Sequence, residues 1–149
     1  MHKMNKSEIL NIIQLKLTQK VETLEKMIAE TRASNNETKS SMGDKYETSR
    51  EMVQQEINNL QIQLKEIIKQ KDFLKTILPK SADKAEKGAV VETEKGLFFI
   101  SISLGEINFD NQKIIAISPE SPLAQAMQGK MKSEIVCINN INQTIKNIW

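Results

Sequence analysis

Two carboxylates three positions apart are the strongest candidates for chemistry in this sequence. Asp44 and Glu47 lie in the stretch Gly43-Asp44-Lys45-Tyr46-Glu47. If a helix begins there, both residues share one face of its first turn. Carboxylate oxygens suit Mg²⁺, but two of them are too few for a tight site, because magnesium needs further ligands and keeps several waters. The pair therefore predicts a contribution to a metal site completed by another molecule. The alternative is a pair of ordinary acidic residues that stabilise a helix N-terminus.

Composition excludes most other catalytic arrangements. The chain of 149 residues has one histidine, His2, and one cysteine, Cys137. A histidine-based triad, an internal disulfide and a cysteine-only metal site are therefore not expected. Ser101 and Ser103 have no histidine to activate them. Cys137 lies among apolar residues of a predicted strand, so we expect it to be a buried small hydrophobe.

The net charge and the distribution of apolar residues indicate which kinds of partner and which cellular compartment to expect. The formal net charge is only +2, so we expect no autonomous recognition of a DNA sequence. The sequence has no run of about 18 apolar residues, and its first residues have no apolar signal region. We therefore expect no membrane partner and a reducing, cytoplasmic location.

Residues 1–78 have the spacing of a coiled coil. They contain no proline and one glycine, whereas residues 79–149 hold every proline and the other glycines. Apolar residues recur at alternating steps of four and three, which is typical of a coiled-coil seam. The seam positions of the second segment are Val53, Ile57, Leu60, Leu64, Ile67, Lys71, Leu74 and Leu78. Those of the first segment are Leu10, Gln14, Leu17, Val21, Leu24 and Ile28, with Gln14 as a polar interruption.

The two segments can pair with each other in an antiparallel hairpin. The facing pairs of one register are Leu10 with Leu74, Leu17 with Ile67, Leu24 with Leu60, Val21 with Leu64, and Ile28 with Ile57. This register puts the turn near residue 42, beside Gly43. An arm of about 30 residues would project roughly 45 Å. The alternative is a coiled coil between two chains.

Residues 89–149 predict a small, mostly antiparallel sheet with one short helix. Strands are expected at 89–93, 98–104, 113–117, 134–138 and 144–149, with hairpin turns at 94–96 and 110–112. In the strand 98–104, alternation places Phe98, Ile100, Ile102 and Leu104 on one face and Phe99, Ser101 and Ser103 on the other. Ser121 suits a helix cap, Pro122 the first helical position and Gly129 the stop.

The expected fold class is therefore α+β, with three parts. Residues 1–78 form an antiparallel coiled-coil hairpin, and residues 89–149 form the β-rich domain. The stretch 79–88 is polar and opens with Pro79, so we interpret it as a linker.

Two motifs in this order resemble the Gre transcript-cleavage factors of bacterial RNA polymerase. The first is Gly43-Asp44-Lys45-Tyr46-Glu47, which is similar to the Gly-Asp-x-x-Glu at the tip of the family's coiled coil. The second is Ile117-Ser118-Pro119-Glu120-Ser121-Pro122-Leu123-Ala124-Gln125-Ala126-Met127-Gln128-Gly129-Lys130, which is similar to a segment of the family's FKBP-like C-terminal domain. The resemblance covers nearly the whole chain in order and architecture. It implies an FKBP-like fold for residues 89–149.

The resemblance also implies a mechanism and a set of site residues. The C-terminal domain would dock beside the secondary channel of the polymerase, and the hairpin would pass down that channel. Asp44 and Glu47 would help to hold a transient second Mg²⁺ and its water at the polymerase active site, where the backtracked transcript is hydrolysed. The chain would be an accessory factor without a stably bound cofactor. Its partners would be RNA polymerase and the 3′ end of the nascent RNA.

Further contacts are expected on both parts of the chain. Candidates for contact with RNA or with the channel are Lys39, Lys45, Tyr46 and Arg50, which flank the tip. Candidates for docking on the polymerase are Ser121, Pro122, Gly129 and Lys130. We call residues 121–130 the docking segment.

Two departures from the family pattern keep other functions open. After Glu47 the family has a run similar to Asn-Ala-Glu-Tyr, but this chain has Thr48-Ser49-Arg50-Glu51; and Ser133-Glu134 replaces a Gly-Asp. A Gre-like protein could occupy the same channel and regulate or inhibit the polymerase without cleavage. A third possibility is a coiled-coil adaptor whose sheet domain binds an unrelated protein.

Overall fold

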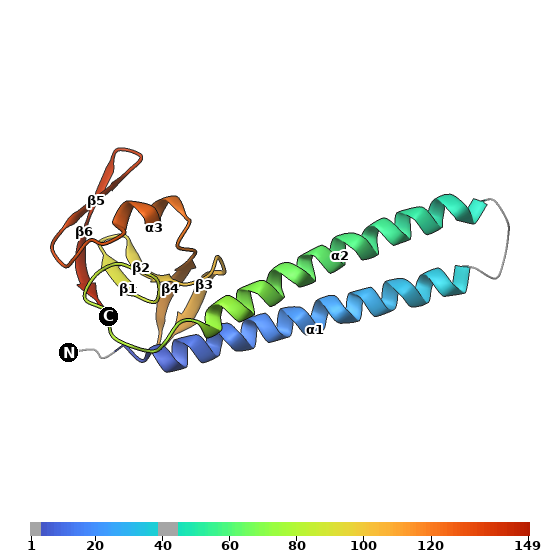
Figure 1. Ribbon diagram of the computed structural model, residues 1–149, viewed down its shortest axis with the longest axis horizontal. Helices are drawn as coiled ribbons and strands as arrows, with labels where there is room; N and C mark the ends of the chain where they lie inside the picture. The colour runs from blue at the N-terminus through green and yellow to red at the C-terminus, as the bar shows by residue number, and fades with distance from the viewer. Residues whose placement is uncertain (1–3, 39–44) are drawn as a thin grey trace. The chain divides into compact units, whose positions relative to one another are not determined.

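The protein folds into two compact units. The computed structural model describes residues 4–38 and 45–149, with only the backbone described at 35–38 and 45–49. Within these residues it contains two long helices, six strands and a short third helix (Figure 1). The first unit, which we call the sheet unit, consists of Met1–Ile13 and Phe73–Trp149. The second, the hairpin unit, consists of Gln14–Asp72. The predicted α+β class is confirmed.

The hairpin unit is built from two antiparallel helices, α1 (Lys6–Thr38) and α2 (Lys45–Lys75). Leu24 and Ile28 of α1 form one buried cluster with Ile57 and Leu60 of α2. Figure 1 shows the two helices side by side along their length. The antiparallel prediction is confirmed, because each helix has a single apolar stripe and buries it against the other.

A polar layer interrupts the seam between the helices. Gln14 and Lys71, the polar positions of the two predicted seams, lie opposite each other. The Gln14 side-chain amide donates to the Lys71 carbonyl at 3.4 Å. The Lys71 ammonium donates to the Thr18 hydroxyl at 3.0 Å. The half-buried Lys71 ammonium thus has a hydrogen-bond acceptor beside the seam, although Thr18 is not one of the predicted seam positions.

Two predicted seam positions are wrong. Leu10 is only half-buried, whereas Ile9 and Ile13 are fully buried, because this end of α1 packs within the sheet unit. Leu78 is 57% exposed, and α2 ends at Lys75. Pro79 explains the early end, because the residue before a proline disfavours the helical conformation. Ile77, at 5% exposure, is buried instead.

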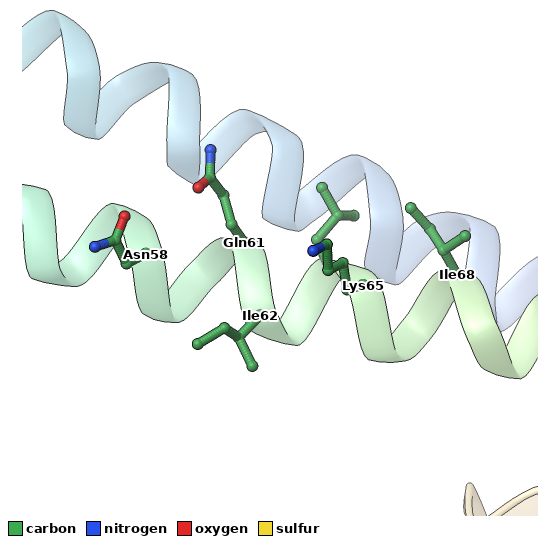
Figure 2. A pocket seen from close by; sticks show the side chains of 6 residues that line it. Asn58, Gln61, Ile62, Lys65 and Ile68 are labelled. Atoms are coloured by element: carbon green, nitrogen blue, oxygen red, sulfur yellow. The ribbon is translucent and has the colours of Figure 1, made fainter.

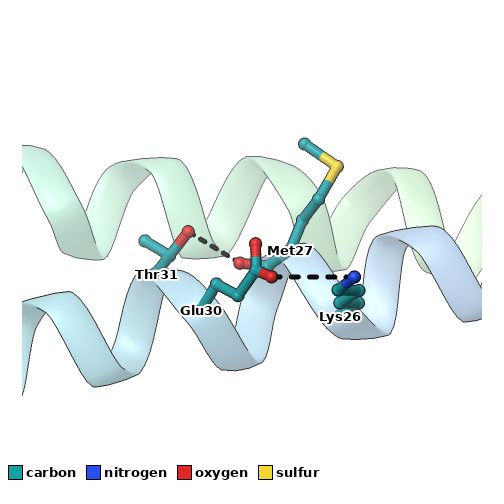
Figure 3. Close-up of polar contacts among 4 residues, drawn as sticks. All are labelled: Lys26, Met27, Glu30 and Thr31. Atoms are coloured by element: carbon teal, nitrogen blue, oxygen red, sulfur yellow. Dashed lines mark hydrogen bonds and ion pairs between the residues drawn. The ribbon is translucent and has the colours of Figure 1, made fainter.

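The outer face of the hairpin carries polar contacts beside exposed apolar side chains such as Ile62. Figure 3 shows one part of α1, where Lys26 and Glu30 approach to 4.0 Å and the Thr31 hydroxyl donates to the Met27 carbonyl at 2.7 Å. Both contacts lie within one helix turn, and exposed pairs of this kind stabilise little. No helix among the described residues has a stretch apolar enough to span a lipid bilayer.

The sheet unit contains a six-stranded sheet in the order β3-β4-β2-β1-β6-β5. The strands are β1 (Val90–Thr93), β2 (Gly96–Ile100), β3 (Gly105–Phe109), β4 (Gln112–Ile117), β5 (Ile135–Ile138) and β6 (Ile141–Ile148). The pair β2–β4 is parallel, and the other neighbours are antiparallel. The prediction of a mostly antiparallel sheet is confirmed.

Burial along β2 differs from the predicted alternation. The strand ends at Ile100, and Phe98, Phe99, Ile100, Ser101 and Ile102 are all buried. The reason is position, since β2 lies near the middle of the sheet and both of its faces are covered. The Ser101 hydroxyl donates to the Phe99 carbonyl at 3.3 Å, which accounts for a buried serine.

Two tight hairpin turns account for the two strands that the sequence analysis missed or began too late, β3 and β6. Asp110 and Asn111 have φ of 50° and 62°, and Asn139 and Asn140 have φ of 52° and 63°. Pairs of positive φ are typical of tight two-residue turns, where asparagine is tolerated. The first turn joins β4 to β3, a strand that the sequence analysis missed. The second starts β6 at Ile141, earlier than the predicted 144.

The predicted linker and the predicted burial of the cysteine both need revision. In the stretch 79–88, Ala85 is fully buried and joins the core cluster of the sheet unit. The stretch thus packs within that unit. Cys137 is exposed, because alternation along β5 turns Val136 inward and Cys137 outward. Its strand is also the last in the sheet order, so one of its edges pairs with no other strand of the described residues.

Candidate functional site

The end of α1 and the start of α2 border the residues that connect the two helices. Helix α1 ends at Thr38 and α2 begins at Lys45, so both ends lie at the same end of an antiparallel pair. Glu47 lies in the first turn of α2, as predicted for one of the two carboxylates. Lys39, Asp44 and the predicted turn near residue 42 lie outside the described residues.

The predicted tip contacts Lys45, Tyr46 and Arg50 all lie in the first two turns of α2. Only Arg50 has a described side chain. It is half-buried, and its Nε is buried without a hydrogen-bond partner among the described residues. The backbone therefore brings Lys45, Tyr46, Glu47 and Arg50 onto the first two turns of one helix, next to the connection.

A shallow hollow of about 560 Å³ lies along α2 in the middle of the hairpin. Its lining includes Ile62 and Ile68, which are 60% and 44% exposed, and Lys65. Figure 2 shows Ile62 pointing away from α1. The lining contains no carboxylate, imidazole or thiol, so it supplies no acid–base pair.

The docking segment contains the short helix that the sequence predicts. Helix α3 spans Pro122–Met127, and the Ser121 hydroxyl accepts from the Ala124 N–H at 3.2 Å. Pro122 occupies the first helical position, where it has no N–H to leave unpaired. On the buried side of the helix, Ala124 and Met127 belong to the core cluster of the sheet unit.

The end of the docking segment is fixed by backbone hydrogen bonds. Gly129 has φ of 78°, a left-handed conformation that favours glycine after a helix. Its N–H donates to the Ala85 carbonyl at 2.7 Å, and the Ala85 N–H donates to the Lys130 carbonyl at 2.8 Å. The structure therefore gives Ser121, Pro122, Gly129 and Lys130 defined structural positions, and their role in docking stays a prediction.

The described residues contain no group of three or more histidine, cysteine, aspartate or glutamate side chains arranged to hold a metal ion. A Mg²⁺ ion bound by two carboxylates of this chain would need further oxygen ligands from another molecule.

Lys6 is a buried cation that the sequence analysis missed. Its side chain is buried, at 5% exposure, in the first turn of α1. Burial lowers the pKa of its ammonium to about 8, and the nearby Glu86 carboxylate acts in the opposite direction. One signal was available, because Lys6 is in helical phase with Ile9 and Ile13, which are fully buried.

Comparison with known proteins finds similarity among solved structures. No protein-family model and no curated protein matches the chain. The structure is similar to a crystal structure of GreA factor homolog 1 (Gfh1) from Thermus thermophilus, with a TM-score of 0.38 and 18% identity, covering 91% of this chain and 94% of that chain. It is also similar to a structure of the transcription factor Gfh1, with a TM-score of 0.37 and 17% identity, covering 89% of each chain. The chain is similar to Gre-factor homologues.

Proposed function

We propose that this protein is a Gre-like elongation factor that binds bacterial RNA polymerase in the cytoplasm. Its hairpin would enter the secondary channel, and its tip would assist the Mg²⁺-dependent cleavage of backtracked transcripts. In this role the chain is an accessory factor, because the hydrolytic site belongs to the polymerase. The observation that supports the proposal is the antiparallel pairing of α1 and α2, with Glu47 in the first turn of α2 at the end of the pair where α1 ends.

The length of the helices supports this role. Helix α1 has 33 residues and α2 has 31, so at the rise of an α-helix each is about 50 Å long. The seam cluster of Leu24, Ile28, Ile57 and Leu60 holds the two helices together over the half nearest the tip. A paired, two-helix arm is stiffer than either helix alone, and a reaction at a remote active site requires such defined positioning.

The tip would act on a metal ion that it holds only together with the polymerase. Asp44 and Glu47 supply two carboxylates, and the polymerase would supply the remaining ligands. When bound, such an ion activates a water and stabilises the charge that develops on the leaving oxygen. The residues of this chain would contribute by orienting the ion and its water. Lys39, Lys45, Tyr46 and Arg50 would contact the RNA 3′ end or the channel wall.

The test is transcript cleavage in a backtracked elongation complex. Wild-type protein should accelerate cleavage above the rate of the polymerase alone. The double variant Asp44→Ala/Glu47→Ala should lose at least about 100-fold of that stimulation, as expected when groups that hold a catalytic ion are removed. A matched control is Glu51→Ala/Glu56→Ala, which removes two exposed carboxylates from the same helix and should retain full stimulation.

The same samples separate the competing functions. Wild-type protein that binds core polymerase without accelerating cleavage would be a channel binder that regulates or inhibits, a role that the departure from the family pattern at Thr48-Ser49-Arg50-Glu51 leaves open. A chain that core polymerase does not retain in a pull-down would instead be a coiled-coil adaptor. Equal stimulation by wild type and by the tip double variant would remove Asp44 and Glu47 from the mechanism.

A further inference from the structure

Lys6 is a buried cation held by two carbonyls far away in the sequence. Its Nζ donates to the Lys80 carbonyl at 2.6 Å and to the Gly88 carbonyl at 2.7 Å. Both acceptors belong to the stretch 80–88, which we call the strap. The ammonium therefore ties the two ends of the strap to the first turn of α1, and all of these residues lie within the sheet unit.

The position of Lys6 is itself fixed. Asn5 caps α1, because its side-chain oxygen accepts from the Glu8 N–H at 3.2 Å. Ile9 and Ile13 are fully buried on the same helix face. Burial of this face directs the Lys6 side chain inward, where an ammonium needs acceptors to offset its lost hydration.

The end of the strap at Gly88 is also constrained. The Gly88 N–H donates to the Ile100 carbonyl at 2.7 Å, and its φ is +92°. A Cβ on this residue would lie only 3.3 Å from Cγ2 of Ile77. A glycine is therefore required here, and the close fit keeps the Gly88 carbonyl aimed at Lys6.

The middle of the strap forms backbone hydrogen bonds with the end of the docking segment. Ala85 is fully buried, and it exchanges two backbone hydrogen bonds with Gly129 and Lys130, at 2.7 and 2.8 Å. Lys84 forms an isolated bridge with Met131. The strap thus pairs with the end of the docking segment much as a short strand would.

We propose that Lys6 is a positioning residue for the docking segment, acting through the strap. The ammonium fixes both ends of the strap, and the strap fixes Gly129 and Lys130 through Ala85. Without the ammonium, the Lys80 and Gly88 carbonyls lose a shared charged donor, which is among the stronger hydrogen-bonding partners. The strap then loosens, and the docking segment loosens with it. The docking role rests on the proposed function, whereas the coupling between Lys6 and Gly129 does not.

Amide hydrogen exchange of the isolated chain tests the coupling. The variant Lys6→Met keeps the length of the side chain and removes the charge and the donors. We expect the Ala85 and Gly129 amides to exchange about tenfold faster or more in Lys6→Met than in wild type, because local opening exposes them. The Ile145 amide, which donates to the Glu134 carbonyl at 2.9 Å, should keep its exchange rate.

Two further variants control the result. Lys16→Met makes the same change at an exposed lysine of α1 and should leave all three amides unchanged. Lys6→Arg restores a cation and should restore most of the protection. Equal acceleration of all three amides in Lys6→Met would show a general loss of stability and overturn the proposal. Unchanged exchange at Ala85 and Gly129 would overturn it as well.

A measurement on the wild-type protein keeps the proposal testable if Lys6→Met does not fold. With ¹⁵N-labelled lysine, the Lys6 ammonium should give a slowly exchanging signal that correlates with the Lys80 and Gly88 carbonyls. Absence of both correlations would remove the basis of the proposal. Polymerase binding is a separate measurement, so a chain that fails to bind would reject the docking role and leave the exchange result intact.

Discussion

The cluster near the tip of the hairpin unit and the core cluster of the sheet unit bury their side chains to different extents. The four buried residues of the hairpin cluster retain between 3% and 9% exposure, because a pair of helices has one shared stripe and solvent on both sides. The eight residues of the core cluster in the sheet unit are all fully buried. We therefore expect the removal of a buried side chain to lower the free energy of unfolding more in the sheet unit than in the hairpin unit. In the hairpin, each seam side chain is less completely buried, so its removal should cost less.

The largest expected effect is a cavity in the sheet unit. Ile100→Ala removes a fully buried side chain from the core cluster, and we expect a loss of about 4 kcal/mol in the free energy of unfolding. Trp149 is the sole tryptophan and lies in this unit, so its fluorescence during urea unfolding measures the change. A loss under about 1 kcal/mol would contradict the described packing.

The corresponding change in the hairpin should cost less. Leu60→Ala removes a seam side chain that retains 5% exposure, and we expect a loss of about 2 kcal/mol, at the lower end for such substitutions. Far-UV circular dichroism follows the two long helices. If Leu60→Ala destabilised its unit more than Ile100→Ala destabilised the sheet unit, the contrast between the two units would be wrong.

A substitution in the polar layer of the hairpin should raise the free energy of unfolding instead of lowering it. Lys71→Leu replaces a polar seam residue by an apolar one, and we expect the hairpin to gain about 1 kcal/mol, because a lysine in a coiled-coil seam lowers stability while it specifies register. Analytical ultracentrifugation should also show some self-association. The exposed residue Lys69 provides the control, since Lys69→Leu should leave stability within about 0.5 kcal/mol of wild type.

The smallest expected effect is a pH dependence from Lys6. Burial lowers the Lys6 pKa from the ordinary lysine value of 10.5 to about 8 in the folded protein, so between these pH values an unfolded chain with an ordinary lysine binds more protons. The free energy of unfolding of wild type should therefore rise with pH in this window, relative to Lys6→Met. Denaturation of both proteins at pH 7.5 and at pH 10 measures the difference. A difference that stays constant or falls with pH would contradict the burial of the ammonium.

The hairpin could be predicted from the sequence because its contacts follow a local rule. Each helix repeats its apolar residues every seven positions, and only one antiparallel register matches Leu24 with Leu60 and Ile28 with Ile57. The end of α2 was missed because the pattern continues to Leu78 although Pro79 stops the helix earlier.

The sheet unit was less predictable because its contacts join distant residues. Nothing local to β2 indicates that a parallel neighbour, β4, covers its edge and that both faces are buried. The same holds for Lys6, whose acceptors at Lys80 and Gly88 are more than 70 positions away. The short helix was predictable, since its cap, its proline and its glycine stop are all local signals.

In the candidate site, too, local features could be predicted from the sequence and long-range contacts could not. The place of Glu47 in the first turn of α2 follows from local acidic and helical signals. The hydrogen bonds that connect Ala85 to Gly129 and Lys130 could not be inferred, because the stretch 79–88 has the composition of a linker. Polar residues can pack tightly when their backbone groups find partners, and composition alone does not report those partners.

The outward position of Cys137 has a practical consequence. Because the chain has no other thiol, a maleimide dye added to the native protein would react at a single known point on β5. A fluorescent reporter could thus be attached without any engineered substitution. The same accessibility calls for a reducing agent during storage, since two molecules could become linked through their Sγ atoms in air.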